Sequence, residues 1–231
     1  MKIGIIGAGN IGGALTRRFR AAGHDVTVAN SRGADTLRGL ADETGATAGT
    51  VADAVADADA VVVTIPLRNI PDLPANLFAG ARGDLVVIDT SNYYPQQRDG
   101  KLDGIEDGGT ESGWVERHLG RPVVKAFNSI IADHLQNGGK PAGAPDRIAL
   151  AVAGDDARAK ATVMALIDGI GFDAVDAGGI ADSWRQQPDT PGYLKDYDVA
   201  GVRRALAEAT PERKPEWRAT ANSPGSYDAP A

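Results

Sequence analysis

The residues near the start of the chain that are best suited to chemistry are three glycines, Gly7, Gly9 and Gly12, spaced as G-x-G-x-x-G. They end a short β-branched run at residues 2–7 and open a helical pattern at residues 10–22. In this setting the first glycine permits a tight turn, the second lets the backbone approach a pyrophosphate, and the third lets helix and strand pack closely. The helix N-terminus adds free amides. The motif predicts a dinucleotide-binding turn, with a ligand-free turn as the alternative; its residues are Gly7, Gly9, Asn10, Ile11 and Gly12.

The end of the next expected strand, residues 25–29, indicates which dinucleotide would bind. An NAD site usually places an acidic residue there, but the first acid after this strand is Asp35. Arg32 instead offers a planar guanidinium that suits a phosphate dianion. The segment therefore predicts NADP(H), and the alternative is a solvated arginine in a turn. The residues expected to bind the cofactor here are Asn30, Ser31, Arg32 and Gly33.

Two later strand ends are expected to reach the same edge of the sheet. The expected strands cover residues 60–65 and 123–127, and ligands bind at the carboxyl ends of strands in open α/β sheets. Pro66 lacks an amide, so the chain leaves the sheet there. Asn128 can donate and accept, which suits the carboxamide of a nicotinamide. Plain strand-end turns are the alternative; the candidate residues are Thr64, Ile65, Pro66, Ala126 and Asn128.

No catalytic residue is identified from the sequence. The three histidines have no carboxylate at metal-ligand spacing, so no metal site is expected. Lys125 could donate a proton, although a lysine in such a place more often reaches solvent. The polar segment 95–113 predicts a solvated lid that carries the carboxylates Asp103, Glu106, Asp107 and Glu111. Since hydride transfer to a carbonyl needs an acid, the lack of one favours transfer between two redox cofactors.

Expected strands alternate with expected helices along the first 180 residues. This pattern predicts an α/β protein of the Rossmann type, with a doubly wound, mostly parallel sheet and helices on both faces. We expect residues 1–180 to be the NADP-binding domain and 181–231 to be a short irregular C-terminal extension with one helix at 199–209. The last ~15 residues are expected to be flexible.

Composition excludes several classes of function. The chain has 231 residues, with 24 basic and 31 acidic side chains and a net charge of −7, which argues against binding nucleic acid or an anionic membrane. It has no cysteine, so it has no disulfide and no thiolate metal site. We expect a cytoplasmic protein, since neither a signal peptide nor an apolar run of membrane-spanning length is present.

Several motifs together resemble a known family. They include the glycine turn, Asn30-Ser31-Arg32-Gly33, Thr64-Ile65-Pro66, residues 124–130, residues 152–156 and residues 176–178, in this order. This combination resembles the deazaflavin (coenzyme F420)-dependent NADP oxidoreductases over residues 1–180. The segment from Ser183 onward departs from the family's closing helix, so the chain resembles a divergent NAD(P)-binding member.

The resemblance implies hydride transfer between NADP(H) and 8-hydroxy-5-deazaflavin, often in a homodimer. It places Ser31 and Arg32 on the 2′-phosphate, and a pocket over the nicotinamide near residues 65–66 and 128–130. Alternatives are reduction of another acceptor, such as a flavin, a quinone or a chelated metal, and a non-catalytic module that senses NADP(H). Because few residues follow Gly178, we expect the acceptor pocket to be completed by loops or by a second subunit.

Overall fold

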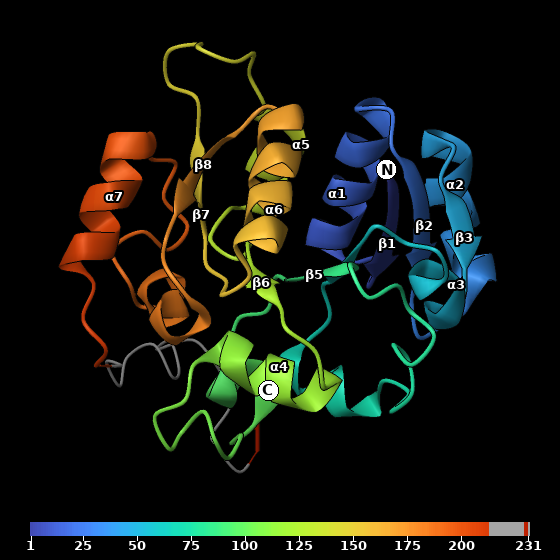
Figure 1. Cartoon of the computed structure of the whole chain (residues 1–231), viewed down its shortest axis with the longest axis horizontal. Coiled ribbons are helices and arrows are strands. Elements are labelled where there is room, and N and C mark those ends of the chain that lie inside the picture. The colour runs from blue at the N-terminus through green and yellow to red at the C-terminus, as the bar shows by residue number, and fades with distance from the viewer. Residues whose placement is uncertain (213–228, 231) are drawn as a thin grey trace.

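A parallel β-sheet organises the protein, as a computed structural model describes it for residues 1–212 and 229–230. The strands run in the order β3-β2-β1-β4-β5-β6, and every neighbouring pair is parallel (Figure 1). This order places a switch point between β1 and β4, where the winding reverses and where dinucleotides bind in such folds. The strands are β1 (Lys2–Ile6), β2 (Asp25–Ala29), β3 (Thr47–Gly49), β4 (Ala60–Val63), β5 (Val86–Asp89) and β6 (Val124–Lys125).

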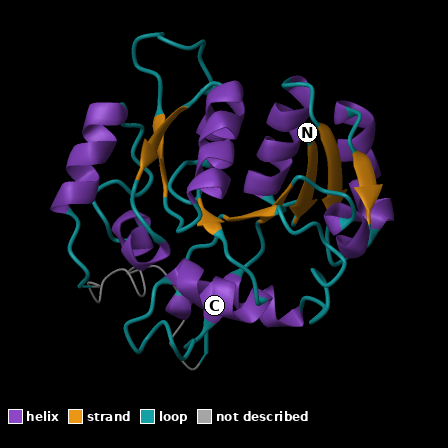
Figure 2. Cartoon of the chain, viewed as in Figure 1, coloured by secondary structure: helices purple, strands orange, loops and turns teal. Residues whose placement is uncertain are grey.

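Side chains alternate between the two faces of the sheet and build a core on each. In β4, Ala60 and Val62 belong to the first core, whereas Val61 and Val63 belong to the second, and all four are fully buried. A strand buried on both faces needs apolar residues at every position, which explains the unbroken run of valines. Figure 2 shows the strands between helices. The prediction of a doubly wound α/β fold is confirmed.

The first core lies under helices that include the one that follows the glycine turn. Phe19 of α1 is fully buried there, and α1 also packs against α5. The arginines of α1 are half-buried beside its apolar face, and Arg18 lies over the ring of Phe172, so the helix is amphipathic, as its sequence predicts. The helices associated with this core are α1 (Asn10–Ala21), α2 (Arg38–Thr44), α5 (Ala132–Asn137) and α6 (Ala157–Gly169).

The opposite core is covered by shorter elements. Trp114 of α4 is buried in it, and α3 packs against β1 and β2. A capping box between Thr50 and Asp53 fixes the start of α3. The elements are α3 (Val51–Val55), the 3-10 helix η2 (Leu67–Asp72) and α4 (Glu111–Leu119), with a π-helical turn η3 (Pro95–Asp99) beside η2.

A second, two-stranded sheet continues the first. Its parallel strands are β7 (Ala149–Val152) and β8 (Asp173–Asp176), and an antiparallel bridge between Lys125 and Ala153 joins it to the end of β6. Helix α7 (Val199–Glu208) packs on both strands. The segment after β8 therefore carries more regular structure than an irregular extension would, including the 3-10 helix η4 (Ile180–Gln186). The predicted flexible end lies almost entirely outside the described residues.

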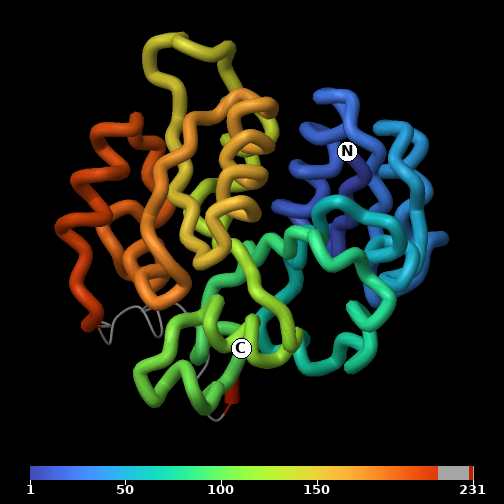
Figure 3. The backbone as a smooth tube through the Cα atoms, in the orientation of Figure 1, coloured from blue at the N-terminus to red at the C-terminus, as the bar shows by residue number. Residues whose placement is uncertain are grey.

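The prediction of a solvated segment at residues 95–113 holds for Asp103 and Asp107, which are exposed, but not for the segment as a whole. This segment is the first part of the green tube in Figure 3, and it holds η3 and the start of α4. Asp99, Ile105 and Glu111 are buried. The segment contributes side chains to the core and to a buried polar network, which its polar composition does not reveal. Among the described helices, none combines the length and the apolar character that crossing a membrane requires.

Candidate functional site

The glycine turn joins β1 to α1, and its three glycines have different reasons to be glycine. Gly7 has φ +111°, and a Cβ there would lie 2.3 Å from the carbonyl oxygen of Thr64. A Cβ on Gly12 would lie 1.9 Å from the carbonyl oxygen of Gly7. A Cβ on Gly9, in contrast, would meet nothing within 4 Å. Protein packing therefore accounts for Gly7 and Gly12. Gly9 borders open space, in which a group of a ligand would lie against the protein backbone.

The N-terminus of α1 opens onto that same space. Gly9 is its N-cap residue and supplies no side-chain hydrogen bond to the first amides. The first turn of α1 contains no acidic residue. Amides without partners and a partial positive charge attract anions, so this helix end suits a pyrophosphate.

The turn after β2 is shaped by Asn30. Its Oδ1 accepts from the backbone N–H of Arg32 at 3.0 Å, and its Nδ2 donates to Thr36 Oγ1 at 2.9 Å. Gly33 has φ +91°, which glycine adopts without strain. Ser31, Arg32 and Gly33 are exposed as a result.

Charges around this turn leave the guanidinium of Arg32 available. Within the described residues Arg32 takes part in no salt bridge. The nearest acid along the chain, Asp35, is paired with Arg38 at 2.5 Å. The carboxylate of Asp35, which would repel a 2′-phosphate, is therefore held by Arg38.

A cavity of about 380 Å³, which we call the edge cavity, lies at the carboxyl ends of β1, β4, β5 and β6. Seven of the candidate residues line it, and they come from three separate segments: Gly9, Asn10, Ile11, Thr64, Ile65, Pro66 and Asn128. Ala126 does not line it, because Ala126 is fully buried in the first core. Gly7 and Gly12 support the turn from below, and Asn30 to Gly33 lie outside the edge cavity, at the end of β2.

Asn128 differs from its expected role because its side chain is already engaged. Its Nδ2 donates to the backbone oxygen of Gln186 at 2.6 Å and to Asn92 Oδ1 at 3.1 Å, and its Oδ1 accepts from Gln186 Nε2 at 3.0 Å. Asn92 in turn donates to the backbone oxygen of Asn128 at 2.8 Å. Asn128 thus fixes a wall of the edge cavity by joining two other segments.

Two further features of the wall are typical of binding sites. Ser91 is buried and lines the edge cavity, yet its Oγ has no hydrogen-bond partner among the described residues. Phe127 has φ +61°, a backbone conformation that non-glycine residues rarely adopt. An unpaired buried hydroxyl and a strained backbone both lower stability, and such features are found more often at functional sites than elsewhere.

The far wall of the edge cavity carries two tyrosines that sequence reasoning did not single out as a pair. The hydroxyls of Tyr94 and Tyr193 are hydrogen-bonded to each other, although 99 residues separate them. The guanidinium of Arg98 lies 5.0 Å from the centroid of the Tyr94 ring. Burial raises the pKa of both phenols, so both stay protonated at neutral pH. The sequence signal was weak: a Tyr-Tyr-Pro run directly after a strand end.

Behind the wall, Lys125 is fully buried and does not reach solvent, which corrects the expectation for this residue. Its Nζ donates to the backbone oxygen of Ser91 at 2.8 Å and to Glu111 Oε2 at 3.1 Å. Glu111 Oε1 accepts from the backbone N–H of Tyr93 at 3.1 Å. Glu111 is therefore a buried partner and not part of a solvated acidic cluster. The pair holds the segment 91–93, which lines the edge cavity at Ser91 and Asn92.

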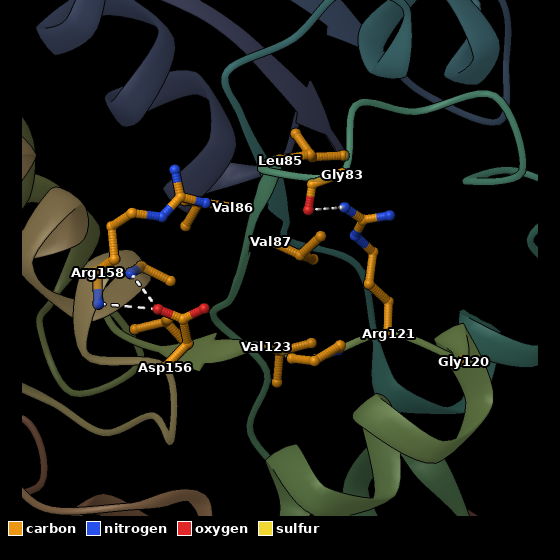
Figure 4. A pocket seen from close by; sticks show the side chains of 12 residues that line it. Gly83, Leu85, Val86, Val87, Gly120, Arg121, Val123, Asp156 and Arg158 are labelled. Carbon is orange, nitrogen blue, oxygen red and sulfur yellow. Dashed lines mark hydrogen bonds between the residues drawn. The ribbon is translucent and has the colours of Figure 1, made fainter.

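Another cavity, of about 310 Å³, contains none of the candidate residues (Figure 4). It is lined by Leu85 and Val123, at the amino ends of β5 and β6, which is the opposite end of these strands from the edge cavity. Arg121 and Arg158 flank it, and both donate to backbone carbonyls of residues 82–84. Within the described residues, no three histidine, aspartate or glutamate side chains gather as a metal site would need.

The strand order, the glycine turn and the cavity at the switch point together define a Rossmann-type dinucleotide-binding domain. Residues 2–93 match a family described as "NADP oxidoreductase coenzyme F420-dependent". Over these residues, which are less than half of its length, the chain is similar to that family.

Several known proteins are similar to this chain. The protein SMa0349 of Sinorhizobium meliloti has a solved structure that is 31% identical, with a TM-score of 0.72, and the match covers 85% of this chain and 95% of that one. A candidate F420-dependent NADP reductase from Arthrobacter sp. FB24 is 25% identical, with a TM-score of 0.64 and coverages of 79% and 87%. The Escherichia coli protein YjhV is 43% identical over 90 residues, which are 39% of this chain and 61% of that protein. The match to YjhV thus spans less than two thirds of the length of that relative.

Proposed function

We propose that this protein is an NADP(H)-dependent oxidoreductase that transfers a hydride between NADPH and a second redox cofactor, with 8-hydroxy-5-deazaflavin as the first candidate. The observation that carries the proposal is the arrangement along one sheet edge of an open glycine turn, a cavity, and an exposed Arg32 that forms no salt bridge within the described residues. The similarity of residues 2–93 to the F420-dependent NADP oxidoreductases supports the choice of both cofactors.

The residues present fit NADP(H) along its length. The open space at Gly9 and the free amides of α1 would hold the pyrophosphate, and Arg32 would pair with the 2′-phosphate. Ile65 and Pro66 would form one side of the nicotinamide's surroundings, and Ser91 offers a hydroxyl that lacks a partner within the described residues. When bound, the nicotinamide supplies the hydride.

The edge cavity limits what the second substrate can be. Ile11, Ile65, Ile130 and Leu194 give it apolar contacts, while polar side chains, including Ser91, Asn92 and the tyrosine pair, make up about half of its lining. Such a lining suits a flat ring system with a polar edge. The loops after β5 and the segment that contains Tyr193 complete the edge cavity from this same chain. A flavin, a quinone and a chelated metal are alternative acceptors, and binding of NADP(H) without turnover is the alternative to catalysis.

Charge reversal at Arg32 tests the cofactor assignment. We expect Arg32→Glu to weaken NADPH binding by about 2–5 kcal/mol, because a charge pair becomes a repulsion, and to affect NADH much less. Arg204→Glu is the matched control, since Arg204 is exposed on α7, away from this turn. Nucleotide fluorescence titrations measure both affinities. Equal losses for NADPH and NADH in Arg32→Glu would contradict the assignment of the 2′-phosphate.

An acceptor assay tests the reaction itself. Purified protein is mixed with NADPH and, in separate reactions, oxidised deazaflavin, riboflavin and a quinone, and the loss of NADPH absorbance is followed. We expect rapid loss with deazaflavin. Loss of NADPH absorbance with another acceptor, and not with deazaflavin, would identify that acceptor as the substrate. Tight NADPH binding without any loss of absorbance would favour the sensing module.

Two further properties rest on the family resemblance and the composition. We propose that the protein acts in the cytoplasm and forms a homodimer. Sedimentation of the purified protein with and without NADPH tests the second property, and a monomer under both conditions would contradict it.

A further inference from the structure

The two tyrosines on the far wall of the edge cavity come from two separate segments of the chain. Tyr94 comes from the chain just after β5 and precedes η3, whereas Tyr193 comes from the segment after η4. Their hydroxyls are hydrogen-bonded, and both residues line the edge cavity. A phenolic hydroxyl can donate one hydrogen bond and accept two. When Tyr193 donates its hydrogen bond to Tyr94, the hydroxyl proton of Tyr94 is therefore available to a ligand.

The surroundings of Tyr94 hold this residue in position. Its backbone N–H donates to Asp99 Oδ2 at 2.8 Å, and the buried Asp99 pairs with Arg98 at 2.9 Å. Arg98 also donates to the backbone oxygen of Asn92 at 2.5 Å and places its cation over the Tyr94 ring. A cation against a phenol ring stabilises negative charge that develops on it. Tyr94 is thus anchored through its backbone, its ring and its hydroxyl.

We propose that Tyr94 is the proton donor of this site and that Tyr193 is the positioning residue that orients its hydroxyl. The inference rests on the proposed hydride transfer and adds a donor for the proton that the reduced acceptor gains. It replaces the view, drawn from the sequence, that the site lacks an acid.

In the proposed step the acceptor receives a hydride and a proton. NADPH gives up a hydride, with its two electrons, to an electrophilic carbon of the acceptor, and a conjugated nitrogen or oxygen of the acceptor gains an electron pair. Tyr94 gives its proton to that atom, so one C–H bond and one N–H or O–H bond form on the acceptor. NADPH becomes NADP⁺, and Tyr94 regains a proton through Tyr193 and solvent.

Other groups near the edge cavity are less suited to this role. Lys125 is fully buried behind the wall and is paired with Glu111. The donors of Asn128 are engaged by Asn92 and Gln186. Among the residues that line the edge cavity, histidine, aspartate and glutamate are not represented. The tyrosine pair is therefore the best acid that the described wall offers.

The test compares three phenylalanine variants with the wild-type protein. Tyr94→Phe removes the donor, Tyr193→Phe removes only its partner, and Tyr197→Phe is the matched control, because Tyr197 packs against the core formed by β7, β8 and α7. For each protein we measure kcat and KM with NADPH and oxidised deazaflavin, the Kd values of both by fluorescence, and the melting temperature.

We expect Tyr94→Phe to lower kcat and kcat/KM together by about 100-fold, as loss of a group that acts in the transition state does, with both Kd values within about threefold of wild type. Tyr193→Phe should lower kcat by about three- to tenfold, because the donor remains but is less well oriented. Tyr197→Phe should behave as wild type.

Three results would overturn the proposal. A kcat for Tyr94→Phe within twofold of wild type would remove Tyr94 as the donor and leave the hydride transfer standing. A loss confined to NADPH affinity and melting temperature would make the pair structural. A wild-type protein that binds NADPH but reduces no deazaflavin would overturn the deazaflavin assignment and this inference together.

Discussion

At the scale of single residues, glycine serves folding at one position of the turn and binding at another. Gly12 has no room for a side chain, since the carbonyl of Gly7 lies where its Cβ would be. Gly9 has room for one in the protein alone. The same residue type therefore reflects a tight helix–strand contact at Gly12, and at Gly9 it leaves the space that the proposed cofactor would approach.

This difference predicts opposite effects for the same substitution. Gly12→Ala should destabilise the fold by about 3 kcal/mol or more, because backbone must move to relieve the contact. Gly9→Ala should leave the melting temperature unchanged but weaken NADPH binding at least about tenfold, or ~1.4 kcal/mol. Thermal unfolding and fluorescence titration measure the two effects. Normal NADPH affinity in Gly9→Ala would show that no ligand approaches this residue closely.

At the scale of elements, α4 holds the end of β5 in place through buried polar contacts. Ser112 Oγ donates to Asp89 Oδ2 at 2.6 Å, and Glu111 bonds Lys125 and the backbone of Tyr93. All of these side chains are buried. Because buried charges are costly unless paired, this network fixes one arrangement of the strand end on which the edge cavity depends.

Breaking the ion pair should therefore cost more than an ordinary surface contact. We expect Lys125→Met to lower the free energy of unfolding by about 3–5 kcal/mol, since it leaves the carboxylate of Glu111 buried without its cation. The double variant Lys125→Met with Glu111→Leu should recover most of that loss. Arg38→Met, which removes an exposed pair, should change the value by less than about 1 kcal/mol. Urea unfolding measures all three, and additive losses in the double variant would contradict a coupled pair.

At the scale of the whole molecule, Gln186 connects the second sheet to the edge cavity. Its Nε2 donates to Asn128 Oδ1 at 3.0 Å and to the backbone oxygen of Ala151 in β7 at 3.3 Å. Leu194, eight residues further on, donates its backbone N–H to the oxygen of Ser129. The segment after β8 thereby brings Tyr193 to the far wall and makes the site depend on both sheets.

Removal of this connection should affect stability and catalysis together. We expect Gln186→Leu to destabilise the protein by about 1–3 kcal/mol, because Asn128 Oδ1 stays buried without a donor. It should also raise KM for the acceptor while the Kd of NADH and NADPH at the glycine turn changes little. Gln136→Leu, which removes a single bond to Arg17, serves as the control. An unchanged KM for the acceptor in Gln186→Leu would show that the C-terminal segment does not shape the acceptor site.

The sequence by itself determined the fold class, the order of strands and helices, and the glycine turn. These depend on local signals: apolar runs of strand length, a 3.6-residue period in α1, and glycines between them. It also placed seven candidate residues that the structure brings to one cavity, because the carboxyl ends of parallel strands meet at one edge.

Only the tertiary structure decided the partners of polar side chains that lie far apart in the chain. From the sequence, the side chain of Lys125 is expected to reach solvent and Glu111 to lie on a solvated lid, and only packing shows them buried against each other. Asn128 and Gln186, or Tyr94 and Tyr193, are 58 and 99 residues apart. Long-range pairing has no period or spacing, since it depends on how the sheets and loops pack, and that packing supplied the acid which the sequence did not disclose.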